Sequence, residues 1–127
     1  MNLVDSSGWL EYFADGKNAK FFVQVIENTE ELIVSTINLY EVYEKILLEK
    51  DENSALQAIA LMQQAKVIDI TISISVMAAK LSYELKIPMA DSSIYSTARI
   101  HDAMVWTQDA DFKDLEKVKY FKKDYFN

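Results

Sequence analysis

The sequence predicts an α/β fold in which a central, mostly parallel sheet of four to five strands is flanked by helices. Short apolar runs alternate with longer helix-like stretches along the chain, which is the pattern of repeated strand-helix-strand units. The chain has 127 residues and half of them are hydrophobic, enough for one compact core but too few for a second domain. We therefore expect a single domain that spans residues 1–127.

The elements of the first half follow from apolar runs and from helix-capping residues. Residues 2–4 form the first apolar run and predict a strand, and the serines after it can cap a short helix over residues 6–13. Apolar residues on adjacent turns predict a second helix around residues 21–26. A second strand is expected at residues 32–34, followed by a Ser/Thr-capped helix over residues 35–50.

The second half continues the alternation of strands and helices. Apolar runs predict two strands, and a weaker run predicts a last one, at residues 67–70, 104–106 and 118–121. Apolar spacing typical of helices recurs between the strands, around residues 56–63, 76–83 and 91–101. The last of these helices follows Pro88, the only proline in the chain. Parallel strands joined by helix pairs are the expected result.

Composition excludes several classes of function. The chain has no cysteine, so disulfides and thiol catalysis are excluded and hard oxygen ligands remain for any metal. The net charge is −7, from 13 basic and 20 acidic residues, which argues against broad neutralisation of nucleic-acid phosphates. No apolar run approaches the ~20 residues of a membrane span, and no secretory signal is visible. We expect a soluble protein of the reducing cytoplasm with no membrane contact.

Lysines supply most of the positive charge, because Arg99 is the only arginine. Four lysines lie near the C-terminus among aromatic residues: Lys117, Lys119, Lys122 and Lys123, with Tyr120, Phe121, Tyr125 and Phe126. Charged side chains on a last strand protect a sheet edge from unwanted pairing. We favour this interpretation over a patch that contacts a substrate.

Four acidic residues are the candidate functional residues: Asp5, Glu41, Asp91 and Asp109. Asp5 ends the first apolar run, and Asp109 follows the run at residues 104–106. If these runs form neighbouring parallel strands, both carboxylates emerge at the sheet edge where open α/β sheets bind their ligands. We interpret the four acids together as one site for a divalent metal.

Each acid also has a structural explanation that requires no metal binding or catalysis. Asp5 and Asp91 occupy positions where an aspartate commonly caps a helix, and Asp109 lies in an acidic turn. Glu41 lies opposite the main apolar stripe of its helix, which alone predicts a solvated side chain. Glu44, one helical turn away, is a competing ligand candidate. The four residues are informative only as a group.

The local sequence around each acid resembles a conserved block of one protein family. The segments are Val4-Asp5-Ser6-Ser7, Ser35-Thr36-Ile37-Asn38-Leu39-Tyr40-Glu41-Val42, Ala90-Asp91-Ser92-Ser93-Ile94 and Thr107-Gln108-Asp109-Ala110-Asp111-Phe112. In this order, and over essentially the whole chain, they resemble the blocks of PIN-domain ribonucleases, most closely VapC-type toxins. The resemblance implies a PIN-like three-layer sandwich. Ser92 and Ser93 depart from the family pattern, which usually has small apolar residues there.

The resemblance also implies the roles of the site residues. It implies four catalytic acids that bind one or two Mg²⁺ or Mn²⁺ ions, namely Asp5, Glu41, Asp91 and Asp109. It implies three supporting residues, namely Asp111, Thr107 and Ser6. Carboxylate oxygens suit Mg²⁺, which also takes phosphate oxygens of a substrate into its coordination shell. The ion makes the attacking water more acidic and stabilises the leaving oxygen, so cleavage would produce a 5′-phosphate and a 3′-hydroxyl.

Partners follow from the same resemblance. It implies an RNA substrate, a toxin homodimer, and a cognate antitoxin whose C-terminal segment wraps the nuclease and blocks its acidic pocket. A histidine base is not required, and we expect His101 to have a capping or packing role at the end of its helix.

Three other classes of protein share some of these sequence features with the nuclease. A response-regulator receiver requires a phosphoacceptor aspartate after a central strand and a lysine after the last strand, and Asp5 and the helix of Glu41 fit this poorly. A haloacid-type phosphatase requires Asp-x-Asp where this chain has Asp5-Ser6-Ser7. The third alternative is a catalytically silent PIN-like module that binds a protein partner, against which the presence of all four acids speaks.

Overall fold

The computed structural model describes residues 1–123. Tyr125 and Phe126, which belong to the C-terminal cluster of lysines and aromatic residues, lie outside the described part. Its central sheet has five strands in the order β3-β2-β1-β4-β5, and each pairing is parallel. The strands are β1 (Asn2–Val4), β2 (Leu32–Ser35), β3 (Lys66–Ile68), β4 (Met104–Thr107) and β5 (Val118–Tyr120). The expected sheet of four to five mostly parallel strands is thus confirmed with five, all of them parallel.

Six α-helices and two short 3₁₀ helices connect these strands within the described residues. The α-helices are α1 (Ser6–Phe13), α2 (Ala19–Ile26), α3 (Thr36–Glu49), α4 (Glu52–Met62), α5 (Ile72–Leu85) and α6 (Met89–Ile100). The 3₁₀ helices are η1 (Thr29–Glu31) and η2 (Ala110–Phe112). Over residues 1–123, no helix combines the length and the hydrophobicity that crossing a membrane requires.

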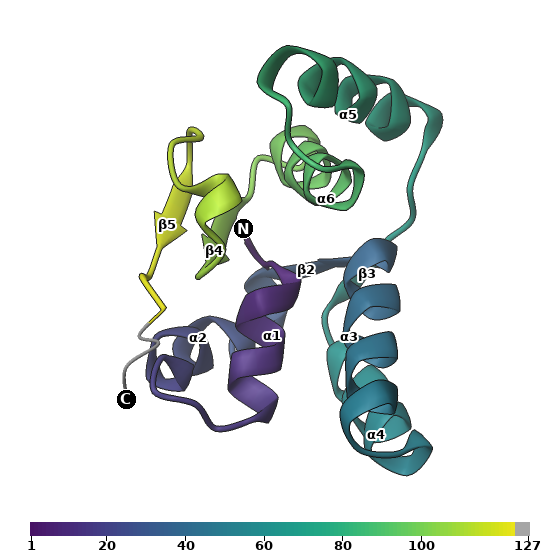
Figure 1. Ribbon diagram of the computed structural model, residues 1–127, viewed down its shortest axis with the longest axis vertical. Coiled ribbons are helices and arrows are strands. Elements are labelled where there is room, and N and C mark those ends of the chain that lie inside the picture. Colours follow the sequence, from purple (N-terminus) through teal and green to yellow (C-terminus); the bar gives the residue numbers. More distant parts are fainter. Residues whose placement is uncertain (124–127) are drawn as a thin grey trace.

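Helices cover both faces of the sheet, which gives the three layers of the expected sandwich. Successive residues of a strand point to opposite faces, so Val4 packs in a core with α1, α2, α3 and α4, whereas Leu3 packs in a core with α5 and α6. Figure 1 shows α5 and α6 lying together, apart from the other helices. Strands buried on both faces require continuous apolar sequences, and this explains why the short runs predicted the sheet.

The N-termini of α1 and α3 are both fixed by side-chain caps. Asp5, and not a serine, caps α1, because its side chain accepts a hydrogen bond from the backbone N–H of Gly8. Ser35 caps α3 as expected, and Asn38 completes a reciprocal capping box by accepting from the backbone N–H of Ser35. Both helices therefore begin directly at the ends of strands β1 and β2.

Helix α6 begins earlier than its sequence predicts. Its N-cap is Pro88 and its first residue is Met89, so Asp91 is the third helical residue and not a cap. A proline pre-sets the backbone angle for a helix start. The carboxylate of Asp91 therefore lies in the first helical turn, where the helix dipole favours negative charge.

Helix α1 packs unusually close to its neighbours at Gly8. A Cβ atom at this position would lie 2.6 Å from Cγ1 of Val4 and 2.8 Å from Cε1 of Phe22. Only a residue without a side chain permits this approach. The contact fixes the height of α1 above the sheet, and with it the position of the residues at the helix start.

The buried face of α4 differs from the expected one. Ala55, Ala58 and Met62 are buried, whereas Leu56, which contributed to the predicted stripe, is 52% exposed. The small side chains of the two alanines allow α4 to lie close to α3. Periodicity identified this helix but not the side that it buries.

One face of α5 carries apolar side chains that are largely exposed in the described part of the chain. Ile72, Val76 and Tyr83 are 84%, 65% and 78% exposed, and their spacing places them on one side of the helix. We call these three residues the α5 stripe. The opposite side of the helix buries Ile74 and Ala78. The apolar pattern that predicted this helix therefore belongs partly to its solvent-facing side.

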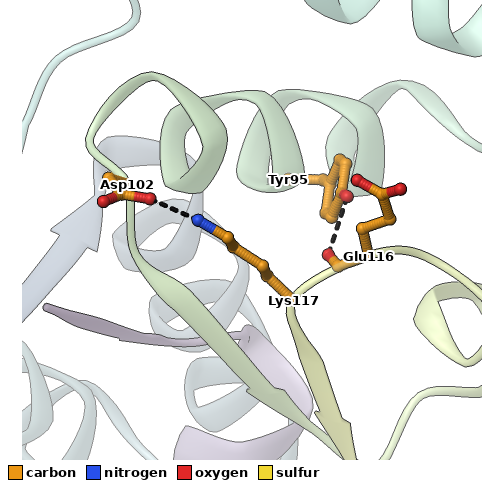
Figure 2. A network of polar contacts seen from close by, with 4 residues as sticks. All are labelled: Tyr95, Asp102, Glu116 and Lys117. Carbon is orange, nitrogen blue, oxygen red and sulfur yellow. Dashed lines mark hydrogen bonds and ion pairs between the residues drawn. The ribbon is translucent and has the colours of Figure 1, made fainter.

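Strand β5 is an edge strand, as expected, but Lys117 before it and Lys119 within it both have partners. Nζ of Lys117 lies 2.6 Å from Oδ1 of Asp102, and the Tyr95 hydroxyl donates a 2.8 Å bond to the carbonyl of Glu116 (Figure 2). The two contacts tie the turn before β5 to the middle of α6 and to the turn that follows this helix. Nζ of Lys119 lies 4.4 Å from the ring centroid of Trp106, within the range of a cation–π interaction.

Candidate functional site: an acidic cluster at the end of the sheet

Three carboxylates converge beyond the C-terminal ends of the central strands. Oxygen atoms of Asp91, Asp109 and Asp111 all lie within 4.8 Å of one another. Asp91 comes from the first turn of α6, while Asp109 and Asp111 come from the N-cap and the second residue of η2, directly after β4. Asp109 also accepts a 2.9 Å hydrogen bond from the backbone N–H of Asp111, which fixes the turn between them.

Crowding of negative charge perturbs the protonation of Asp91. Burial, a hydrogen bond with Asp111, and the charges of Asp109, Asp111 and Asp5 together raise the pKa of Asp91 to about 8. Like charges held in one partly desolvated place oppose one another's ionisation. A bound cation would relieve this repulsion, so the cluster meets the chemical requirement of a divalent-metal site: several hard oxygen donors with excess negative charge.

Asp5 lies beside this cluster at the end of β1. Its side chain is 2% exposed, and Oδ1 accepts a 2.8 Å bond from the Ser7 hydroxyl and a 3.2 Å bond from the backbone N–H of Gly8. Burial raises the pKa of Asp5 to about 7, aided by the charge of Asp109 and opposed by its hydrogen bonds, including one with Thr107. Asp5 is therefore both a helix cap and a neighbour of the three-carboxylate group.

Thr107 links two of the predicted acids. It is fully buried at the end of β4, and its hydroxyl accepts a 2.8 Å bond from the backbone N–H of Asp109. The same hydroxyl bonds to Asp5 and lowers the pKa of that residue. The Thr107 hydroxyl therefore lies between Asp5 and the backbone of Asp109.

Glu41 stands apart from the three-carboxylate group but is tied to the start of α1. Its Oε1 accepts a 2.6 Å hydrogen bond from the hydroxyl of Ser6, the residue after Asp5. Its side chain is half-buried, so the solvated position that the helical wheel predicted is not what the structure has. Glu44 is exposed and accepts from the hydroxyl of Tyr40, so of the two glutamates Glu41 is the one bonded to the start of α1.

Two polar residues next to the acids were not among the predicted site residues. The Ser7 hydroxyl donates to Asp5 and accepts a 3.2 Å bond from the backbone N–H of Gln108, so it joins the end of β1 to the loop after β4. Asn38, fully buried in α3, donates a 3.0 Å bond from Nδ2 to the hydroxyl of Ser6. The Ser35-x-x-Asn38 spacing was a sequence signal for a cap, and the contact of Asn38 with Ser6 becomes visible only in the fold.

The two serines that depart from the family pattern have local partners. The hydroxyl of Ser92 donates to the carbonyl of Ile87, and that of Ser93 donates to the carbonyl of Met89. Both side chains are buried and their donors are satisfied within α6 and the turn before it. His101 is the C-cap residue of α6, in agreement with the expected capping role.

Comparison with protein families identifies the fold. Residues 3–118 match the family model of the PIN domain. The chain belongs to the PIN domain family. No curated protein matches it in sequence.

Solved structures that are similar to this chain include a toxin–antitoxin complex and a toxin. A toxin–antitoxin complex from Klebsiella pneumoniae aligns with a TM-score of 0.76 and 23% identity over 94% of this chain and 96% of that one. VapC20 of Mycobacterium tuberculosis, a toxin that cleaves the sarcin-ricin loop, aligns with a TM-score of 0.80 and 15% identity over 93% and 97%. VapBC2 of Rickettsia felis, bound to a DNA fragment from its promoter, aligns with a TM-score of 0.76 and 16% identity over 95% and 98%.

Proposed function

We propose that this protein is a metal-dependent endoribonuclease toxin of the VapC type, which a cognate antitoxin neutralises. The observation that carries the proposal is the convergence of Asp91, Asp109 and Asp111 beside buried Asp5, at the sheet edge of a PIN domain. A site with this much negative charge repels an RNA phosphate unless a cation lies between them. A divalent metal bound by the acidic residues would therefore allow the site to bind an RNA phosphate.

The residues that would hold Mg²⁺ or Mn²⁺ are the four acids Asp5, Glu41, Asp91 and Asp109, with Asp111 in support. When bound, the ion would supply a Lewis acid that activates water and stabilises charge on the scissile phosphate. The chain orients the donors: Thr107 and Ser7 hold the buried Asp5, and Ser6 holds Glu41. Hydrolysis would leave a 5′-phosphate and a 3′-hydroxyl on the RNA.

Cleavage of single-stranded RNA by purified protein tests this proposal. We expect activity with Mg²⁺ or Mn²⁺ that EDTA abolishes and that Asp5→Asn reduces by at least 100-fold, because the amide can still cap α1 but lacks the charge that binds the ion. Asp111→Asn should have a smaller effect, since this side chain is exposed at the margin of the group.

A matched control is Asp69→Asn. Asp69 also follows a parallel strand, β3, but is exposed and does not belong to the three-carboxylate group. Its replacement should leave cleavage unchanged. Cleavage that resists EDTA, or an Asp5→Asn variant as active as the wild type, would contradict the metal mechanism. Absence of cleavage by the wild type with every RNA and metal tested would favour the catalytically silent, protein-binding alternative.

A groove beside the acidic site supports an antitoxin partner. It has a volume of about 580 Å³ and runs between α1, α3 and α4, with Ser7 and Gln108 among its lining residues. Leu10, Phe13 and Ile46 supply apolar contacts, as a groove that receives an amphipathic helix requires. Because Ser7 bonds to Asp5, a segment that fills the groove could continue directly into the acidic pocket.

A second copy of the chain is the partner that we propose for the α5 stripe. Ile72, Val76 and Tyr83 are each more than half exposed, and apolar side chains on one helix face gain free energy when a symmetric copy covers them. The homodimer would form on the side of the sheet covered by α5 and α6, away from the proposed antitoxin groove.

A further inference from the structure

A directed chain of three hydrogen bonds leads from the backbone of β2 to the carboxylate of Glu41. The backbone N–H of Ser35 donates to Oδ1 of Asn38 at 3.0 Å, and Nδ2 of Asn38 donates to the Ser6 hydroxyl oxygen at 3.0 Å. The Ser6 hydroxyl in turn donates to Oε1 of Glu41 at 2.6 Å. Asn38 is completely buried and Ser6 is 8% exposed, so water has little access to the first two bonds.

The direction of this chain follows from the chemistry of its groups. A backbone N–H can only donate, so Oδ1 of Asn38 must face Ser35 and the amide group must face Ser6. An amide NH₂ also can only donate, so the Ser6 oxygen is the acceptor of that bond. Its single proton is then left for Glu41, whose Oε1 accepts it. Each bond determines the direction of the next.

We propose that Asn38 is a positioning residue for Glu41. By supplying an N–H to Ser6, Asn38 holds the hydroxyl in the rotamer that donates to Oε1, and so holds a long, half-buried side chain in one conformation. The carboxylate of Glu41 is thereby held next to Ser6, which is the first residue of α1 and directly follows Asp5. The inference rests on the proposed function only in that Glu41 is taken to be part of the metal site.

Groups that orient a metal ligand affect the affinity for the metal, not only the rate of the reaction. The test is therefore the Mn²⁺ dissociation constant, measured by calorimetry, together with the melting temperature in EDTA. Asn38→Ala and Ser6→Ala should each weaken Mn²⁺ binding by about tenfold. The double variant Asn38→Ala/Ser6→Ala should bind no more weakly than Ser6→Ala alone, because Asn38 acts only through Ser6.

Ser35→Ala is the matched control for helix capping. The Ser35 hydroxyl accepts a 3.1 Å bond from the backbone N–H of Ile37, so this variant removes a cap at the same helix end and leaves the bonds from Asn38 to Glu41 intact. It should lower the melting temperature in EDTA about as much as Asn38→Ala does, with Mn²⁺ affinity unchanged within about twofold. A purely structural role of Asn38 would make the two variants alike in both measurements.

Asn38→Asp is a second variant that tests the proposal if Asn38→Ala does not fold. It keeps the oxygen that accepts from Ser35 and removes the N–H that faces Ser6, so two carboxylates then compete for one hydroxyl proton. The negative charge that Asn38→Asp adds affects Mn²⁺ binding equally whether or not the Ser6 hydroxyl is present. Comparing the effect of Asn38→Asp in the wild-type background with its effect in the Ser6→Ala background therefore cancels this contribution. We expect Asn38→Asp to weaken Mn²⁺ binding several-fold more in the wild-type background than in the Ser6→Ala background.

The proposal would be overturned if Asn38→Asp weakened Mn²⁺ binding equally in the wild-type and Ser6→Ala backgrounds. It would also be overturned if the loss of Mn²⁺ affinity in Asn38→Ala/Ser6→Ala were the product of the losses in the two single variants. Glu41→Gln separates this failure from failure of the proposed site. If Glu41→Gln weakens Mn²⁺ binding but Asn38→Ala does not, only the positioning role is wrong. If Glu41→Gln leaves Mn²⁺ binding unchanged, Glu41 is not a ligand and both the ligand assignment and the positioning role fall.

Discussion

The backbone N–H of Asp5 donates a 3.1 Å hydrogen bond to the carbonyl of Trp106. This bond lies at the point where the neighbouring parallel strands β1 and β4 end. It sets the register that places the side chain of Asp5 beside Thr107 and near Asp109. Two acids separated by about a hundred residues in the sequence are therefore brought together by ordinary strand pairing.

Asp109→Asn should leave the metal-free protein as stable as the wild type or more stable. The substitution removes one of the charges that raise the pKa values of Asp5 and Asp91, and the amide oxygen can still accept from the backbone N–H of Asp111. Mn²⁺ should raise the melting temperature of the wild type by mass action and that of the variant by less. Thermal melts in EDTA and in Mn²⁺ measure both effects. A clear loss of stability in EDTA with an unchanged response to Mn²⁺ would show that Asp109 is a turn residue only.

Asp91→Asn should show the same gain in EDTA without a compensating loss of a helix cap. Asp91 lies in the first turn of α6 but is not its N-cap residue, and an amide can still donate a hydrogen bond to Asp111, so the main loss is the favourable interaction of the charged carboxylate with the helix dipole, about 0.3–1 kcal/mol. Urea denaturation of the two variants in EDTA compares them directly. A loss of more than about 2 kcal/mol for Asp91→Asn would indicate a structural role that its contacts do not predict.

The stability of the metal-free protein should fall as the pH rises from about 5 to 8. In the folded protein the pKa values of Asp5 and Asp91 are about 7 and about 8, above the ordinary value of 3.8. In this range the folded state holds protons that the unfolded state has released, so the free energy of unfolding decreases with pH, for Asp5 by at most about 1.4 kcal/mol per pH unit.

Urea denaturation in EDTA at a series of pH values measures this slope. Asp5→Asn should flatten the curve, and Mn²⁺ should stabilise the wild type more at pH 8 than at pH 5.5 because the ion competes with protons for the same carboxylates. A stability that rises steadily with pH in EDTA would contradict the proposed crowding of carboxylates.

The antitoxin should present a basic side chain, most favourably an arginine, to the acidic pocket. A guanidinium would bind two carboxylate oxygens and replace the charge of the metal with its own. Inhibition of RNA cleavage should then weaken as Mn²⁺ increases, and Asp91→Asn should bind the antitoxin less tightly. If Mn²⁺ leaves the inhibition curve unchanged and Asp91→Asn binds the antitoxin normally, inhibition takes place elsewhere on the protein.

Much of the site could be predicted because its acids lie at the ends of short, strongly apolar strands. Asp5 and Asp109 follow β1 and β4, and their place at one sheet edge needs only parallel pairing of the two runs. Asp91 and Glu41 are different, since helical periodicity suggests a cap for one and a solvated face for the other. Both were proposed as site residues through the resemblance to the family and not through periodicity.

The remaining features depend on contacts between distant parts of the chain. The bond between Asn38 and Ser6 joins residues 32 positions apart, and nothing in either local sequence specifies the other. The α5 stripe illustrates a second limit, because apolar spacing identifies a helix but does not distinguish a face that the core covers from one that stays exposed. In both cases the outcome, a hydrogen-bond partner or an exposed helix face, is determined by tertiary packing.

Calorimetric titration of Mn²⁺ into metal-free protein at pH 8 tests the central claim, that the converging carboxylates are a divalent-metal site. The wild type and Asp69→Asn should bind Mn²⁺ with the same affinity, and Asp91→Asn should bind at least tenfold more weakly because it loses one ligand of the three-carboxylate group. Equal affinities for all three proteins, or no binding by the wild type at millimolar Mn²⁺, would contradict the claim.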